Sequence, residues 1–159
     1  MTTKTTVSAF LTIGILALVA GWLVAQDEHK HETPPEGFPK NPSPEGAEVY
    51  IISPKDGDTV PKTFTVQFGL KGMGIAPAGI AFPNSGHHHL LVDAPGEPDH
   101  NLPLPADDNH LHYGAGQTET ELTLEPGKHT LQLVLGDLNH VPHDPPVVSK
   151  TITITVEDN

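Results

Sequence analysis

The chain has 159 residues and a formal net charge of −12, from 8 Lys and Arg against 20 Asp and Glu. This acidic balance argues against nucleic acid and anionic lipid as partners, because both bind basic surfaces. With no cysteine in the sequence, disulfides, thiolate metal sites and thiol nucleophiles are excluded. The unusual features that remain are 17 Pro and 11 His, which indicate extended segments and binding by imidazole groups.

A weakly basic start at Lys4 is followed by an uncharged, mostly apolar run over residues 9–25. This pattern is typical of a secretory signal peptide, so we predict a signal segment over 1–25 with cleavage after Ala25. An uncleaved anchor is the alternative, because about 17 apolar residues approach the shortest helix that spans a bilayer. The rest of the chain is predicted to be exported, either free in the periplasm or anchored to the inner membrane by this segment alone.

Residues 26–46 contain five Pro and few apolar side chains, which predicts a disordered, Pro-rich linker. From residue 47 the pattern changes to short segments rich in β-branched residues, several of which alternate apolar and polar positions. We therefore predict one domain over 47–159. Its expected strands are 48–52, 63–70, 88–92, 119–124, 129–135 and 147–156.

Pro and Gly turns separate these segments, and no stretch after residue 26 has a helical period. The predicted fold class is all-β: an immunoglobulin-like antiparallel β-sandwich of about seven strands, with two long loops at 71–86 and 94–118. Loops of this length in a compact domain usually carry function. Segment 125–137 is similar to the strand that carries the tyrosine corner of immunoglobulin-like domains, so we expect a structural role for His129.

Histidines gather in three short clusters, at 87–89, 110–112 and 140–143. Alternate side chains of a strand share a face, so the first and last histidines of the first two clusters project in pairs that can chelate one ion. The third cluster lies in a Pro-stiffened loop before the last strand. The predicted metal ligands are His87, His89, His110, His112, His140 and His143.

Neutral imidazole suits Cu(II) and Zn(II), whereas the lack of Cys and the near lack of Met disfavour a Cu(I) site. A metal ion, Cu(II) or Zn(II), is therefore the predicted ligand. Carboxylates near the clusters are candidates for supporting the imidazoles, namely Asp93, Asp108, Glu119, Asp137 and Asp144. The alternative is that the histidines bond one another and the nearby backbone, and so brace the long loops.

The sequence contains no motif typical of a serine hydrolase, a nucleotide-binding protein or a zinc protease. There is no Gly-x-Ser-x-Gly elbow, no phosphate-binding Gly-Lys-Ser/Thr loop and no HExxH helix. The sequence therefore does not favour an enzyme. A metal-dependent oxidoreductase stays open, because it requires only one free coordination position on the metal.

Several segments together resemble a bacterial exported family, domain of unknown function 4399; these are 69–79, 84–93, 110–122, 126–137 and 139–149. The resemblance covers about residues 47–157 and implies a small exported domain without an agreed activity. Segments 53–68, 126–137 and 151–156 are also similar to periplasmic copper-resistance carriers. That looser likeness implies a β-sandwich with histidine-based Cu(II) sites.

Two functions follow from the sequence. The first is an exported, histidine-rich metal-binding module that captures or carries Cu(II) or Zn(II). The second is a non-enzymatic immunoglobulin-like domain of the cell envelope, whose histidines brace loops and whose long loops 71–86 and 94–118 meet an envelope protein or a glycan.

Overall fold

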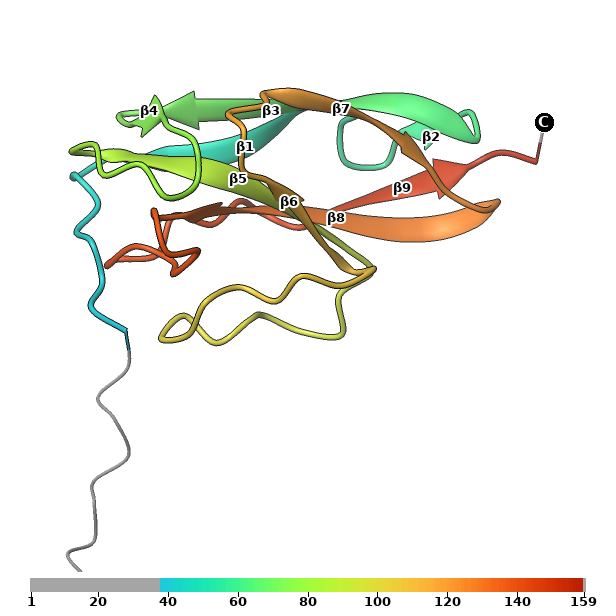
Figure 1. Cartoon of the computed structure of the whole chain (residues 1–159). Coiled ribbons are helices and arrows are strands. Elements are labelled where there is room, and N and C mark those ends of the chain that lie inside the picture. Colours follow the sequence, from blue (N-terminus) through green and yellow to red (C-terminus); the bar gives the residue numbers. More distant parts are fainter. Residues whose placement is uncertain (1–37, 159) are drawn as a thin grey trace, which may run out of the picture. The chain divides into compact units, whose positions relative to one another are not determined.

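The structure, a computed structural model, describes residues 38–158, which form nine strands and no helix (Figure 1). Among these residues there is no helix with the length and hydrophobicity needed to span a bilayer. The predicted signal segment 1–25 and most of the predicted linker 26–46 lie outside the described residues.

One sheet contains three antiparallel strands in the order β1–β3–β7, which are β1 (Glu48–Ser53), β3 (Thr63–Lys71) and β7 (Glu119–Thr123). Along β3 the side chains of Phe64, Val66 and Phe68 are buried, while the polar residues between them are exposed. Such alternation is what a strand with one face on a core and one face in water requires.

The other sheet has the order β2–β9–β8–β5–β4, with β6 also paired to β5. Its strands are β2 (Thr59–Val60), β4 (Gly74–Ile75), β5 (Ser85–Val92), β6 (His110–Tyr113), β8 (Gly127–Gly136) and β9 (Ile152–Val156). The two-residue strands β2 and β4 run parallel to their neighbours β9 and β5, respectively, and the longer pairings are antiparallel.

The two sheets pack face to face, with β1, β3 and β7 in one layer and β5, β8 and β9 in the other (Figure 1). Apolar side chains from both inner faces fill the space between the layers. The buried members of this core are Val49, Ile51, Phe64, Val66, Phe68, Leu90, Val92, Leu122, Leu131, Leu133, Leu135, Val147, Ile154 and Val156. The predicted all-β sandwich is therefore confirmed.

A second, smaller core lies on the outer face of the second sheet. Leu91 of β5 and Val134 of β8 are buried there against Leu104, which belongs to the long loop between β5 and β6 (Figure 1). The Leu104 amide donates to the carbonyl of His140 at 2.8 Å, so this loop is tied to the loop between β8 and β9. As a result, β5 is covered on both faces and all eight of its residues are buried.

The two long loops predicted at 71–86 and 94–118 contain strands that the sequence did not reveal. Strand β4 and the start of β5 lie within the first, and β6 lies within the second. In contrast, the last predicted strand is shorter than expected: 147–151 makes only an isolated bridge through Val148, and β9 begins at Ile152. Gly has low strand propensity, so pairing rather than local preference extends β5: Ser85 and Gly86 pair with β4, and His87 pairs with β8.

The end of the segment predicted as linker is bonded to the sandwich. The amide of Ser43 donates to the carbonyl of Asp144 at 3.1 Å, and the Asp144 amide donates to the carbonyl of Asn41 at 3.0 Å. The side-chain amide of Asn41 also donates to Asp137 at 2.7 Å. Within the described residues, the ordered structure thus extends upstream of residue 47.

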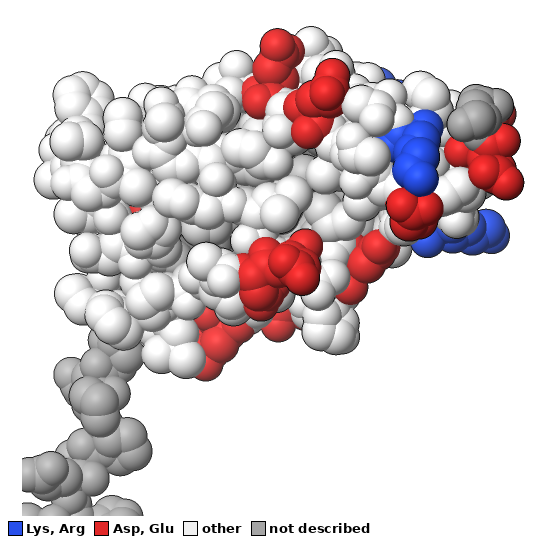
Figure 2. Space-filling view, turned by 45° about the vertical axis from the view of Figure 1, so that its right-hand side comes forward, with Lys and Arg blue, Asp and Glu red and all other residues white. Residues whose placement is uncertain are grey.

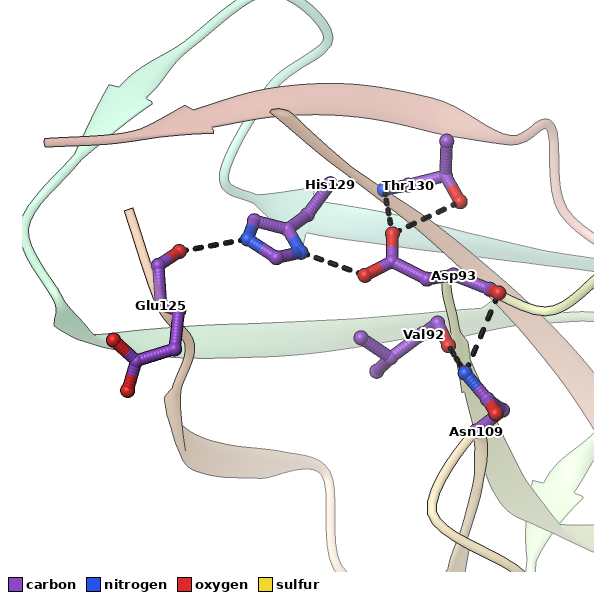
Figure 3. A network of polar contacts seen from close by, with 6 residues as sticks. All are labelled: Val92, Asp93, Asn109, Glu125, His129 and Thr130. Carbon is purple, nitrogen blue, oxygen red and sulfur yellow. Dashed lines mark hydrogen bonds and ion pairs between the residues drawn. The ribbon is translucent and has the colours of Figure 1, made fainter. Parts of the chain in front are cut away.

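At the start of β8, His129 occupies the position of a tyrosine corner, as the sequence predicted. Its Nε2–H donates to the carbonyl of Glu125 at 2.8 Å, and its Nδ1–H donates to the carboxylate of Asp93 at 2.6 Å (Figure 3). The other carboxylate oxygen of Asp93 accepts the amide of Thr130 at 2.7 Å. Both ring nitrogens therefore face acceptors, an arrangement that favours the imidazolium form.

These contacts shift both pKa values. Burial of the His129 ring opposes its charge, but the bonds to Asp93 and to the Glu125 carbonyl outweigh burial and raise the pKa of His129 above 6.5. Burial likewise opposes the Asp93 carboxylate, but the bonds from Thr130 and His129 outweigh it and lower the pKa of Asp93 below 3.8.

The His129–Asp93 pair is therefore expected to stabilise the fold mainly between about pH 4 and pH 6.5. The stabilisation from His129 is complete below pH 6.5 and is lost as the pH rises through its raised pKa. The stabilisation from Asp93 is present above pH 3.8 and is lost as the pH falls through its lowered pKa. His129→Phe should lower the free energy of unfolding by about 1 kcal/mol in that window, because the pair is partly exposed and screened.

Urea unfolding from pH 3 to pH 9 measures this difference, which should shrink above pH 7. Glu125→Gln is the control for the turn: it removes only the exposed ion pair between Glu125 and Lys62, and it keeps the Glu125 carbonyl that bonds to His129. A His129→Phe effect that does not change with pH would contradict the proposed ion pair.

Candidate metal centre

The alternation of β5 sends its three consecutive histidines to opposite faces. His88 points into the core between the sheets, where its ring lies 5.0 Å from that of Phe68. His87 and His89 point to the outer face, beneath the loops, and are 0% and 1% exposed. The predicted pair at i and i+2 is thus formed, but in a buried setting.

Two further imidazoles join this pair. On the neighbouring strand β6, His112 lies directly opposite His89, with ring centroids 5.1 Å apart. From the loop after β8, the His140 ring lies 5.0 Å from that of His87 and 4.8 Å from that of His112. One nitrogen each of His87, His89 and His112 can be chosen so that all three lie within 4.8 Å of one another. We call these four residues the imidazole cluster.

The loop that carries His140 is organised by the buried carboxylate of Asp137, which is 1% exposed. One oxygen accepts the amides of Asn139 at 2.8 Å and Val141 at 3.0 Å. The other oxygen accepts the side-chain amide of Asn41 at 2.7 Å. The backbone reverses at His140, whose φ is +67°, a conformation that these bonds hold in place.

Two glycines make room for the imidazole rings because they have no side chain. A Cβ atom on Gly114 would overlap the ring atoms Cε1 and Nε2 of His112. A Cβ atom on Gly136 would come within 2.9 Å of His89 Nε2. Strands β6 and β8 thus flank the cluster with backbone rather than with side chains.

Electrostatics keep the buried imidazoles neutral. Burial, followed by repulsion from His140 and His112, lowers the pKa of His87 to about 4, even though the nearby Asp137 raises it. Burial and repulsion from the other three rings of the cluster lower the pKa of His89 to about 2. Burial and His140 also lower the pKa of the more exposed His112. At neutral pH His87, His89 and His112 therefore offer uncharged nitrogen lone pairs, the form that binds metal.

The buried histidines of the cluster have few partners other than each other. His87 Nε2 and His89 Nε2 are 3.0 Å apart, which fits one N–H donating to one bare nitrogen. Within residues 38–158, the Nδ1 atoms of both rings are buried without a hydrogen-bond partner. Four nitrogens bound tetrahedrally to Zn²⁺ at about 2.0–2.1 Å stand about 3.3 Å apart. One nitrogen of each of His87, His89 and His112 lies within 4.8 Å of the others, so these rings must draw closer to share one ion.

The remaining predicted ligands lie outside the imidazole cluster. His110 shares a face with His112, but its Nδ1 lies 2.7 Å from the carboxylate of Asp107. His143 is buried elsewhere, with its ring nitrogens 3.3 Å and 3.2 Å from the carbonyls of Leu135 and Ser85. Both histidines therefore have partners of their own in the protein.

Among the five candidate carboxylates, Asp137 lies beside the imidazole cluster, where its charge acts on His87. Asp93 bonds to His129 and Thr130, and Glu119 accepts the side chain of Gln67 at 3.1 Å. Asp108 and Asp144 are exposed. Sequence reasoning did not identify Asn41, because a polar residue within a Pro-rich stretch gives no signal of a contact made 96 positions away.

Comparisons with known proteins give a family and distant structural similarities. A family model described as Domain of unknown function (DUF4399) matches residues 66–157, and no curated protein matches the chain significantly. The chain is similar to the endo-β-1,4-mannanase from Thermotoga petrophila, with 16% identity and a TM-score of 0.43 over 71% of this chain. It spans only 20% of the mannanase chain.

A second similarity is to the fibronectin(III)-like modules of Clostridium thermocellum CbhA. The identity is 13% and the TM-score is 0.29, over 68% of this chain and 92% of that one. The family match is the informative finding, because it covers more than half of the chain and includes all four histidines of the imidazole cluster. The chain belongs to the DUF4399 family of domains of unknown function.

Proposed function

We propose that the protein is an exported metal-binding module that captures and carries Cu(II) or Zn(II) at the imidazole cluster. The observation that carries this proposal is the convergence of four imidazoles from three separate segments, β5, β6 and the β8–β9 loop. Two of them are fully buried and are held neutral by that burial. An all-nitrogen donor set suits both metals.

Capture begins at the one exposed ligand in this proposal. His112 is exposed, whereas His87 and His89 lie beneath it and His140 is half-buried. An ion would meet His112 first and then replace the bond between the Nε2 atoms of the buried pair. The formal charge of −12 raises the local concentration of cations around the protein. The carboxylate of Asp137 offsets part of the charge that a divalent ion brings to a site of neutral ligands.

The bracing role that the sequence left as an alternative applies to other histidines. His88, His129 and His143 each have a backbone carbonyl beside a ring nitrogen, which is how a side chain braces a loop or a turn. The buried rings of the imidazole cluster lack such carbonyl partners. The two roles are thus divided between different residues, and the metal-binding role is proposed only for the cluster.

Replacing the exposed ligand tests the site without disturbing the core. His112→Ala should weaken Cu(II) or Zn(II) binding by about 100-fold or more, since changes to outer-shell groups alone cost about 10–100-fold. The measurements are calorimetric titration and metal-dependent melting of the purified protein. At about 100 times Kd, the wild type should gain about 2.7 kcal/mol of stability.

The matched control is His110→Ala, on the same strand and face but bonded to Asp107. It should bind metal as the wild type does. Equal affinity in the two variants would exclude His112 as a ligand, and a wild type without affinity for either metal would refute the proposed function.

Neutralising the buried carboxylate tests its role in holding a divalent ion. Asp137→Asn should weaken binding of Cu(II) or Zn(II) by about 10–100-fold, because it removes the charge beside the cluster. The loss should be smaller for Cu(I), which carries one charge less, so the reduction potential of bound copper should rise. A purely structural role for Asp137 would weaken both oxidation states alike. Asp144→Asn, an exposed carboxylate nearby, is the control and should change neither affinity.

Filling the space beside His112 tests the geometry while keeping every ligand. Gly114→Ala forces the exposed His112 ring to move, because the new methyl group overlaps its Cε1 and Nε2 atoms. We expect metal affinity to fall toward that of His112→Ala, with little change in the melting temperature without metal. Retained affinity would show that His112 does not bind through its present position.

A further inference from the structure

One end of the domain carries almost no charge although the whole chain carries −12. Residues 72–92, 109–118 and 138–143 contain no Lys, Arg, Asp or Glu. Hydrogen bonds join these segments: the Ala78 amide donates to the Gly114 carbonyl at 2.8 Å, and the Gly79 amide to the Leu138 carbonyl at 3.0 Å. Figure 2 shows acidic side chains over the upper middle, the right and the lower parts of the view and an almost uncharged left-hand end.

Apolar side chains project from this uncharged end. Phe82 is 69% exposed and Ile80 is 54% exposed, and they are the two most exposed large apolar residues in the range 38–158. They lie on one loop beside a groove of about 400 Å³. The loop, residues 80–83, forms one wall of the groove, and other lining residues are Asn41, Pro42 and Leu138. Projecting apolar side chains beside a groove are unusual on a surface that meets only water.

We propose that this end is a docking surface for a second copy of the same chain, which forms a two-fold symmetric dimer. A two-fold interface must be self-complementary, with each copy offering both the part that inserts and the part that receives it. The loop 80–83 and the groove beside it lie on one patch. In such a pair, Phe82 of each copy enters the groove of the other.

Charge favours a second copy meeting this end rather than any other. Two chains of −12 repel wherever their acidic surfaces approach each other. Contact through the uncharged ends keeps most of the acidic side chains of the two copies apart (Figure 2). The dimer does not depend on the proposed metal function, because none of the four histidines of the imidazole cluster lines the groove.

Sedimentation of the purified protein over a range of concentrations tests the proposal. We expect a monomer–dimer equilibrium that becomes tighter as NaCl rises from about 0.05 M to about 0.5 M, because salt screens the repulsion between the acidic surfaces and leaves the apolar contact of Phe82 intact. An interface built on ion pairs would weaken instead. Phe82→Asp should weaken the dimer by about tenfold or more, since it places a charge in the apolar contact.

Ile52→Asp is the matched control: it adds the same charge at another exposed apolar residue, 41% exposed on β1, and should leave dimerisation unchanged. Equal weakening by both variants would overturn the proposal, as would a wild type that stays monomeric at every concentration and salt. If a monomeric wild type bound phosphatidylcholine vesicles and Phe82→Asp did not, the surface would be assigned to lipid and the dimer rejected.

Discussion

The register of β5 is the constraint on which both the core and the imidazole cluster depend. His88, Leu90 and Val92 face the other sheet, while His87, His89 and Leu91 face the opposite side. A slip of one residue would move every one of these side chains to the other face. The pairings of β5 with β8 on one edge and with β6 on the other fix this register. The same pairings set His112 beside His89.

Burial on the outer face is the second requirement, and the loops supply it. A sandwich strand normally turns its outer face to water, where imidazoles titrate near their ordinary pKa. Here the loops after β5 and β8 cover that face, and the bond from Leu104 to the His140 carbonyl ties them together. This cover lowers the pKa values of His87 and His89. The loops thus turn a pair of histidines on one face of a strand into buried, neutral imidazoles.

The sequence allowed the fold class and the i, i+2 pairs to be predicted, because strand alternation is a local property of the chain. It did not separate His140 from His143, since both stand in one short loop. Their separation depends on the +67° backbone at His140 and on the bonds to Asp137, which are properties of the folded loop. Likewise, the space left at Gly114 and the contact of Asn41 with Asp137 depend on segments far apart in sequence.

Hydrogen-bond partners separate His143 from His87 more clearly than burial does. His143 and His87 are both almost completely buried, yet His143 has a carbonyl oxygen near each ring nitrogen. His87 has only another imidazole at Nε2 and, within the described residues, no hydrogen-bond partner at Nδ1. A buried polar atom without a partner costs about 1–3 kcal/mol, so the His87 and His89 rings, each with an unpartnered Nδ1, would be a poor choice for bracing alone. The proposed cation would explain why these rings meet beside the buried charge of Asp137.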